Sequence, residues 1–151
     1  MAEVSLRLDA FIPYLLSVTS NVVSDAIAGS YQALFGLTIP EWRLIAVIAE
    51  SDGLTQQALG AATRMDKVTV SRATIALVDR GLVERQPHVS DRRSQSLHLT
   101  ASGRDLHAAI APKALELERR IFASFDPREV AAFSDMLVRV QQATLAVRDE
   151  A

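Results

Sequence analysis

The hydrophobic pattern changes its period at Gly81, and this change constrains the fold more than any other feature. Between Thr55 and Arg80 apolar residues recur at helical spacing, in two short segments separated by a tight connection at Arg64-Met65. After Gly81 two extended runs, LVERQ and SLHLT, flank the polar loop PHVSDRRSQ. The first part predicts a helix-turn-helix and the second a β-hairpin. This order of two helices and two strands predicts a winged helix.

Capping residues indicate where the two short helices begin and end. Thr55 and Asp66 are predicted N-caps, because their side-chain oxygens can accept a hydrogen bond from the first turn. Gly81 is predicted to stop the second helix. The intervening turn has Arg64 where a glycine would adopt a left-handed backbone without strain. Either this turn avoids the left-handed region or Arg64 adopts it.

Longer helical segments flank this unit. One is predicted at about Asp9–Phe35, and a shorter one from Pro40, at its first position, to about Glu50. Helical character resumes at about Ala101–Ser124, with a bend expected at Pro112. The run DPRE starts a last helix, for which Asp126 is the predicted N-cap.

The first and last helices each carry an apolar stripe. In the first helix it comprises Leu8, Phe11, Leu15, Val18, Val22 and Ala26. In the last it comprises Phe133, Met136, Leu137, Val140 and Leu145. A monomer would expose these stripes, so we expect them to be buried across a two-fold axis between two chains.

These patterns predict one domain over residues 1–151, mainly α with a small β-hairpin. A winged helix-turn-helix lobe is expected at about 37–100, and N- and C-terminal dimerisation helices at about 1–36 and 101–151.

Charge is distributed unevenly along the chain. The net charge is −2, yet the window Arg64–Arg93 holds seven cations and four acids. The remaining residues hold nine cations and fourteen acids. A local basic footprint on an acidic body is more typical of a DNA-binding protein than of a general polyanion binder.

The second short helix is the candidate DNA-reading element. Its N-terminal, outward side carries cations and hydroxyls, and a recognition helix enters the major groove by that end. Arginine there can bind guanine with two hydrogen bonds. The alternative is a solvated amphipathic helix. The candidate contacts in the two helices and their turn are Thr55, Gln56, Arg64, Lys67, Thr69, Ser71 and Arg72.

The hairpin loop holds the other candidate contacts, Asp91, Arg92 and Arg93. Paired arginines at a hairpin tip are suited to a narrow minor groove or to phosphates, with Asp91 orienting one of them. The alternative is a solvated charged turn.

The segments MDKVTVSR, ALVDRGLVER and SDRRSQSLHLTASG together resemble the MarR family of winged-helix transcriptional regulators. The family's wing pattern, D-x-R followed by L-T-x-x-G, is matched by residues 91–93 and 99–103, and GLTIPEWRLIAVIAE resembles the family's preceding helix. The resemblance implies a homodimer with two DNA-binding lobes. A dimer places two reading helices about one DNA turn apart, ~34 Å, and so predicts a palindromic operator on double-stranded DNA. It also implies repression relieved by a small ligand bound between the lobe and the dimerisation helices. Arg64 departs from the family, which often has glycine in this turn.

A small aromatic or amphipathic effector has one candidate pocket. Its lining could be formed by Tyr14, Tyr31, Phe35 and Trp42, with Arg43 as the counter-charge. Core packing is the alternative role for these aromatic residues. Cysteine is absent, which excludes sensing of oxidants through thiols.

Other classes of function have little support. His88, His98 and His107 lack metal-ligand spacing, and no nucleophile or acid–base pair stands out, so we expect no metal, no cofactor and no enzyme. A winged helix that binds proteins instead of DNA is the main alternative, and the basic window argues against it. No apolar run approaches the ~20 residues of a membrane span, and the start of the chain lacks a secretory pattern, so a cytoplasmic protein is expected.

Overall fold

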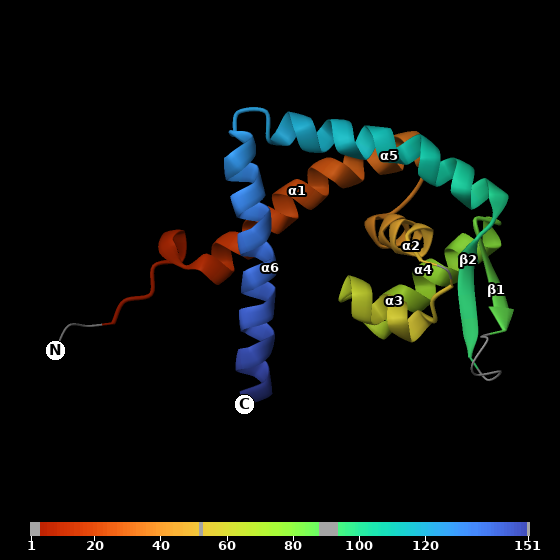
Figure 1. Ribbon diagram of the computed structural model, residues 1–151, viewed down its shortest axis with the longest axis horizontal. Coiled ribbons are helices and arrows are strands. Elements are labelled where there is room, and N and C mark those ends of the chain that lie inside the picture. Colours follow the sequence, from red (N-terminus) through yellow and green to blue (C-terminus); the bar gives the residue numbers. More distant parts are fainter. Residues whose placement is uncertain (1–3, 52, 88–93, 151) are drawn as a thin grey trace. The chain divides into compact units, whose positions relative to one another are not determined.

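The computed structural model describes residues 4–51, 53–87 and 94–150 (Figure 1). The chain divides into two compact units, Met1–Pro112 and Lys113–Ala151. After a 3-10 turn at Leu8–Ala10, the first unit holds α1 (Ile12–Phe35), α2 (Ile39–Ala49), α3 (Gln56–Thr63), α4 (Lys67–Asp79), β1 (Val83–Pro87), β2 (Gln95–Leu99) and the start of α5 (Ala101–Ile121). The second unit holds the rest of α5 and α6 (Pro127–Glu150). The predicted fold class, mainly α with one antiparallel hairpin, is confirmed.

Side-chain caps start the helices of the first unit. Thr38 Oγ1 accepts from the Glu41 amide at 3.3 Å, and Glu41 Oε1 accepts from the Thr38 amide at 3.2 Å, which makes a reciprocal capping box. Helix α2 therefore begins at Ile39, one residue before the predicted start at Pro40. Thr55 Oγ1 accepts from the Ala58 amide at 3.1 Å at the start of α3, as predicted.

The turn between α3 and α4 is left-handed at Arg64, with φ 58° and ψ 20°. Arg64 thus adopts the conformation that glycine would adopt without strain. Beside it, the Thr63 hydroxyl donates to the Leu59 carbonyl at 2.6 Å and accepts from the Met65 amide at 3.4 Å. These bonds hold the turn at the angle that directs the chain into α4.

The base of the hairpin contacts both α3 and α4. Strands β1 and β2 pair in antiparallel register from Val83↔Leu99 to Pro87↔Gln95. Leu54, just before α3, adds a bridge to β2, in which the Leu97 amide donates to the Leu54 carbonyl at 2.8 Å. Figure 1 shows the hairpin beside α4, where the chain passes directly from α4 into β1. The wing is therefore held to both helices of the helix-turn-helix.

The core of the first unit lies among α2, α3, α4, β2 and the first half of α5. Its fully buried side chains include Leu37, Leu44, Ile45, Leu59, Leu77, Leu97 and Ile110. The junction from β2 to α5 closes this core through Thr100, whose hydroxyl donates to the Gly81 carbonyl at 2.6 Å and accepts from the Gly103 amide at 3.1 Å. A Cβ at Gly103 would overlap the Leu82 backbone oxygen. The L-T-x-x-G pattern is thus explained by packing.

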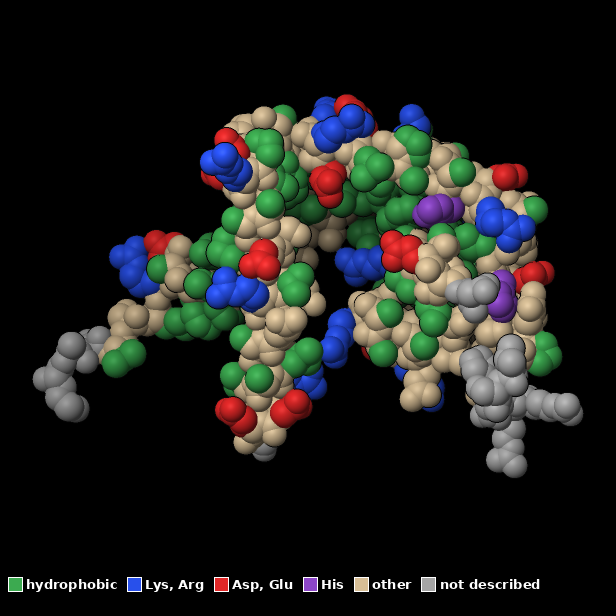
Figure 2. All heavy atoms as spheres, viewed as in Figure 1, with side chains coloured by type: hydrophobic (Ala, Val, Ile, Leu, Met, Phe, Trp, Pro, Cys, Tyr) green, Lys and Arg blue, Asp and Glu red, His purple; other side chains and the backbone are tan. Residues whose placement is uncertain are grey.

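Helices α1 and α6 expose most of their apolar side chains in the single chain. In α1 only Tyr31 is buried, and α6 buries none. Figure 2 shows hydrophobic side chains reaching the surface over both helices. Helix α5 continues through Pro112 and ends at Ile121, three residues before the predicted end. Helix α6 is capped as predicted, since Asp126 Oδ1 accepts from the Arg128 amide at 2.8 Å.

No single helix in the described part of the chain is long and apolar enough to cross a membrane. Only the pair α1 and α2, bent by 82° at the break between them, passes that test when taken together.

Candidate nucleic-acid interface

Helix α4 has one buried face and one exposed face. The buried face follows helical spacing and comprises Val70, Ala73, Thr74 and Leu77. Val78, four residues after Thr74, is only half-buried. Thr74 is buried although it is polar, because its hydroxyl donates to the Val70 carbonyl at 2.7 Å and needs no water. Lys67 and Arg72 are exposed, whereas Ser71 is half-buried.

The N-terminus of α4 is capped by Asp66. Its Oδ1 accepts from the Thr69 amide at 2.8 Å, and its Oδ2 accepts from the Thr69 hydroxyl at 2.8 Å. The bond from the Thr69 amide is the main reason why the pKa of Asp66 lies below its usual value. The Thr69 hydroxyl proton is held by the cap. Thr69 can therefore accept a hydrogen bond from a base amino group, but it cannot donate one while the cap is intact.

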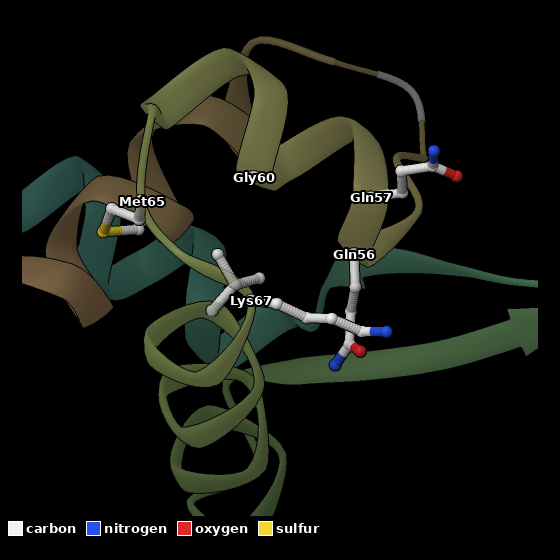
Figure 3. A pocket seen from close by; sticks show the side chains of 6 residues that line it. Gln56, Gln57, Gly60, Met65 and Lys67 are labelled. Carbon is white, nitrogen blue, oxygen red and sulfur yellow. The ribbon is translucent and has the colours of Figure 1, made fainter.

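A groove of about 500 Å³ separates the N-termini of α3 and α4. Its lining residues are Gln56, Gln57, Gly60, Met65, Lys67 and Val70. Figure 3 shows the side chains of Gln56 and Lys67 extending toward each other from the two helix starts, while Gln57 points away. Lys67 thus lies close to the positive ends of two helix dipoles, an arrangement that attracts phosphate. Thr55 stands one residue before α3 and uses its hydroxyl oxygen in the cap.

A second groove, of about 390 Å³, lies between the start of α3 and the hairpin. It is lined by Thr55, Gln56, Gln57, Arg85, Ser94, Gln95 and Leu97. Arg85 was not among the predicted DNA contacts, although it belongs to the basic window. Its position on β1 could have been inferred, but only the fold brings this strand beside α3.

One cation of the basic window has a structural role. Arg80 donates from Nη1 to the Gly36 carbonyl at 3.1 Å and from Nη2 to the Phe35 carbonyl at 3.2 Å, so it caps the C-terminal end of α1. Within the described ranges, the exposed cations left for a polyanion in this window are Arg64, Lys67, Arg72 and Arg85. The predicted wing contacts Asp91, Arg92 and Arg93 lie outside the described residues and stay predictions.

Of the predicted pocket residues, Tyr31 and Trp42 lie in contact. Tyr31 is buried, its ring centroid lies 5.1 Å from that of Trp42, and burial raises the pKa of its hydroxyl. His107 of α5, which the sequence did not suggest for this site, stacks on Trp42 at 5.9 Å. Tyr14 is exposed about 25 Å from Tyr31 along α1, by the helical rise. Arg43 directly follows Trp42 in the sequence, and its side chain is exposed. Packing accounts for Tyr31, and the pocket remains a prediction.

Over residues 4–51, 53–87 and 94–150, no three His, Asp or Glu side chains gather in a way that could hold a metal ion. The groups present at the interface are exposed cations, amides and hydroxyls around two helix N-termini. Such groups bind phosphates and base edges.

Comparison with known proteins gives consistent matches. The model of the MarR family matches residues 35–94. The HTH-type transcriptional repressor Rv2887 of Mycobacterium tuberculosis H37Rv is 27% identical over 132 residues, which cover 87% of this chain and 94% of that protein.

Two solved structures show the same fold along most of the chain. A MarR/EmrR family transcriptional regulator from Acinetobacter sp. ADP1 superposes with a TM-score of 0.85 at 22% identity, covering 92% of this chain and 98% of that one. The PcaV transcriptional regulator from Streptomyces coelicolor, solved in complex with its natural ligand, has a TM-score of 0.77 at 21% identity and covers 94% and 99% of the two chains.

Proposed function

Because the chain belongs to the MarR family of winged helix-turn-helix transcriptional regulators, we propose that it represses transcription as a homodimer on a palindromic operator, and that a small effector releases it from DNA. DNA-binding regulation follows from the family, and repression is the activity named for the mycobacterial relative. The palindrome, the dimer and the effector are our inferences for this chain.

The observation that carries the proposal is the exposed, capped start of α4. Asp66 fixes the first turn, and Arg72 projects to solvent from the following turn, on the side opposite the buried face. Lys67 adds a positive charge at the helix end that faces a major groove in helix-turn-helix proteins. Arg72 is then placed to bind a guanine edge, and Lys67 a phosphate.

The exposed stripes of α1 and α6 support the dimer. Phe11, Val22 and Phe133 are 41%, 64% and 40% exposed in the single chain. Apolar patches of this extent are rare on monomers, so a second copy would bury them. Two-fold symmetry would place two α4 helices about one DNA turn apart, ~34 Å, and would match inverted half-sites.

The effector site that we propose is the Tyr31–Trp42–His107 cluster. Aromatic faces and an imidazole bind small aromatic molecules by stacking, and Arg43 is close in sequence as a counter-charge for an acid. The PcaV structure, solved with its natural ligand, is an example of a protein of this fold that binds a ligand.

The test uses the full-length chain to select duplexes from a randomised DNA pool. We expect an inverted repeat, an affinity that falls with salt because phosphate contacts release counterions, and two chains per particle in light scattering. Arg72→Ala should weaken the selected site by about 1–3 kcal/mol, while Arg148→Ala serves as the control for loss of charge.

A pool without enrichment would favour the alternative, a protein-binding winged helix. Equal affinity of a folded Arg72→Ala variant would overturn the role of α4. A monomer that bound the repeat tightly would overturn the dimer.

A further inference from the structure

The exposed face of α4 contains two aliphatic side chains beside its arginine. Val68 is 58% exposed and Ile75 is 50% exposed, and they lie on the same side of the helix as Arg72. Most other large aliphatic residues of the lobe are buried. A β-branched residue also has a lower helix propensity than alanine, so Val68 adds little to the stability of α4 by packing or by propensity. The stability of the fold therefore does not explain why an exposed valine stands at position 68.

We infer that Val68 reads a base, by contacting the C5 methyl group of a thymine in the major groove, next to the base pair bound by Arg72. This inference rests on the proposed function. The thymine methyl is the apolar group that the major groove offers to a protein. Valine has no donor or acceptor, so it would leave the polar edge of any other base desolvated and unpaired. Val68 would select thymine by contact and reject other bases by that desolvation.

The helix geometry fixes where this thymine lies. Residues four apart on one helix face have Cβ atoms about 5–6 Å apart, and base pairs are stacked about 3.4 Å apart. The thymine contacted by Val68 should therefore be one or two base pairs from the guanine bound by Arg72. Val68 is the second residue of α4, at the end that enters the groove. Ile75 lies about 10 Å further along the axis, toward the opposite end of α4.

Replacing thymine by deoxyuridine tests this contact, because it removes only the methyl group and keeps the base pair. Duplexes selected by the full-length chain are resynthesised with one thymine of one half-site replaced at a time. We expect one such position, one or two base pairs from a guanine. There the replacement should weaken binding about three- to fivefold, which corresponds to the transfer free energy of one buried methyl group. Val68→Ala should weaken the unmodified duplex by a similar factor and remove the effect of deoxyuridine at that position.

Ile75→Ala is the matched control, since it truncates another aliphatic residue that is at least half exposed on the same helix face. It should keep the full sensitivity to deoxyuridine. Val68→Ala should fold, because the side chain is exposed and alanine favours helix.

Insensitivity of the wild type at every thymine, or full sensitivity retained in Val68→Ala, would overturn the role of Val68. The loss of affinity in Arg72→Ala would still support the proposed function in that case. Failure to select any duplex would overturn both.

Discussion

Replacing Arg64 by glycine should stabilise the fold and weaken DNA binding at the same time. Arg64 is the single non-glycine residue with positive φ among the described residues. The left-handed conformation costs a residue with a Cβ about 1–2 kcal/mol. Glycine removes that cost. It also destabilises the fold by about 0.4–1 kcal/mol, because it raises the conformational entropy of the unfolded chain. The net gain should be about 0.5–1 kcal/mol, or an increase of about 1–4 °C in Tm for a chain of this size.

The effect on DNA should have the opposite sign. The Arg64 side chain is exposed in the turn between α3 and α4, where a cation can reach a phosphate. Losing that contact should weaken binding to all sequences and lower the slope of log affinity against log salt by about 1. Arg64→Ala is the matched control, because it removes the same charge and keeps the Cβ.

The assays are thermal unfolding followed by circular dichroism and fluorescence anisotropy with a labelled duplex. Protein concentration is held constant, since dimerisation would make Tm depend on it. Arg64→Gly should melt above Arg64→Ala, and the two should bind DNA equally weakly. If Arg64→Gly melts at or below the temperature of Arg64→Ala, the left-handed backbone at residue 64 is not strained. An unchanged salt slope in both variants would refute the phosphate contact.

Three further changes test separate parts of the account. Arg93→Ala, in the predicted wing loop, should weaken binding to all duplexes and lower the salt slope by about 1, and a change of preference at one base pair would contradict this predicted role. Arg80→Ala should destabilise the fold by about 1 kcal/mol, because it loses the bonds to Gly36 and Phe35, and an unchanged Tm would show that these bonds contribute nothing. Asp66 has a lowered pKa, so its cap stabilises the fold above the unfolded pKa of about 3.9 and is lost as pH falls through the folded pKa. Asp66→Ala should therefore lower Tm at pH 7 and make little difference at the lowest pH where the protein folds, and an equal difference at both would contradict this.

Local signals in the sequence were sufficient for the starts of α3 and α4 and for the winged-helix order, but they placed the start of α1 and the end of α5 about three residues off. Thr55 and Asp66 cap the helices that they were predicted to cap, because capping depends on residues only three positions away. The alternatives at Arg64 could not be resolved in this way. A turn with arginine is compatible with several backbone conformations, and the packing of α3 on α4 decides among them.

Contacts between distant segments were not predictable. His107 stacks on Trp42 across α2 and α5, and Leu54 bridges to Leu97 of β2. Neither pair has a local signature, since each depends on how whole elements pack. The exposure of Val68 was missed for a related reason. Valine suggests a buried position, and only the observed phase of the buried face, centred on Val70 and Leu77, shows that Val68 points outward.

Guanine methylation interference tests most directly whether α4 reads the major groove of a palindromic site. Methylation at N7 places a methyl group on the atom that Arg72 is expected to bind, in the major groove. The full-length chain is mixed with a sparsely methylated selected duplex, and bound and free DNA are compared. We expect methylation of one guanine in each half-site to block binding, with the two guanines related by the dyad of the repeat. Binding unaffected by methylation of every guanine in the site would contradict it.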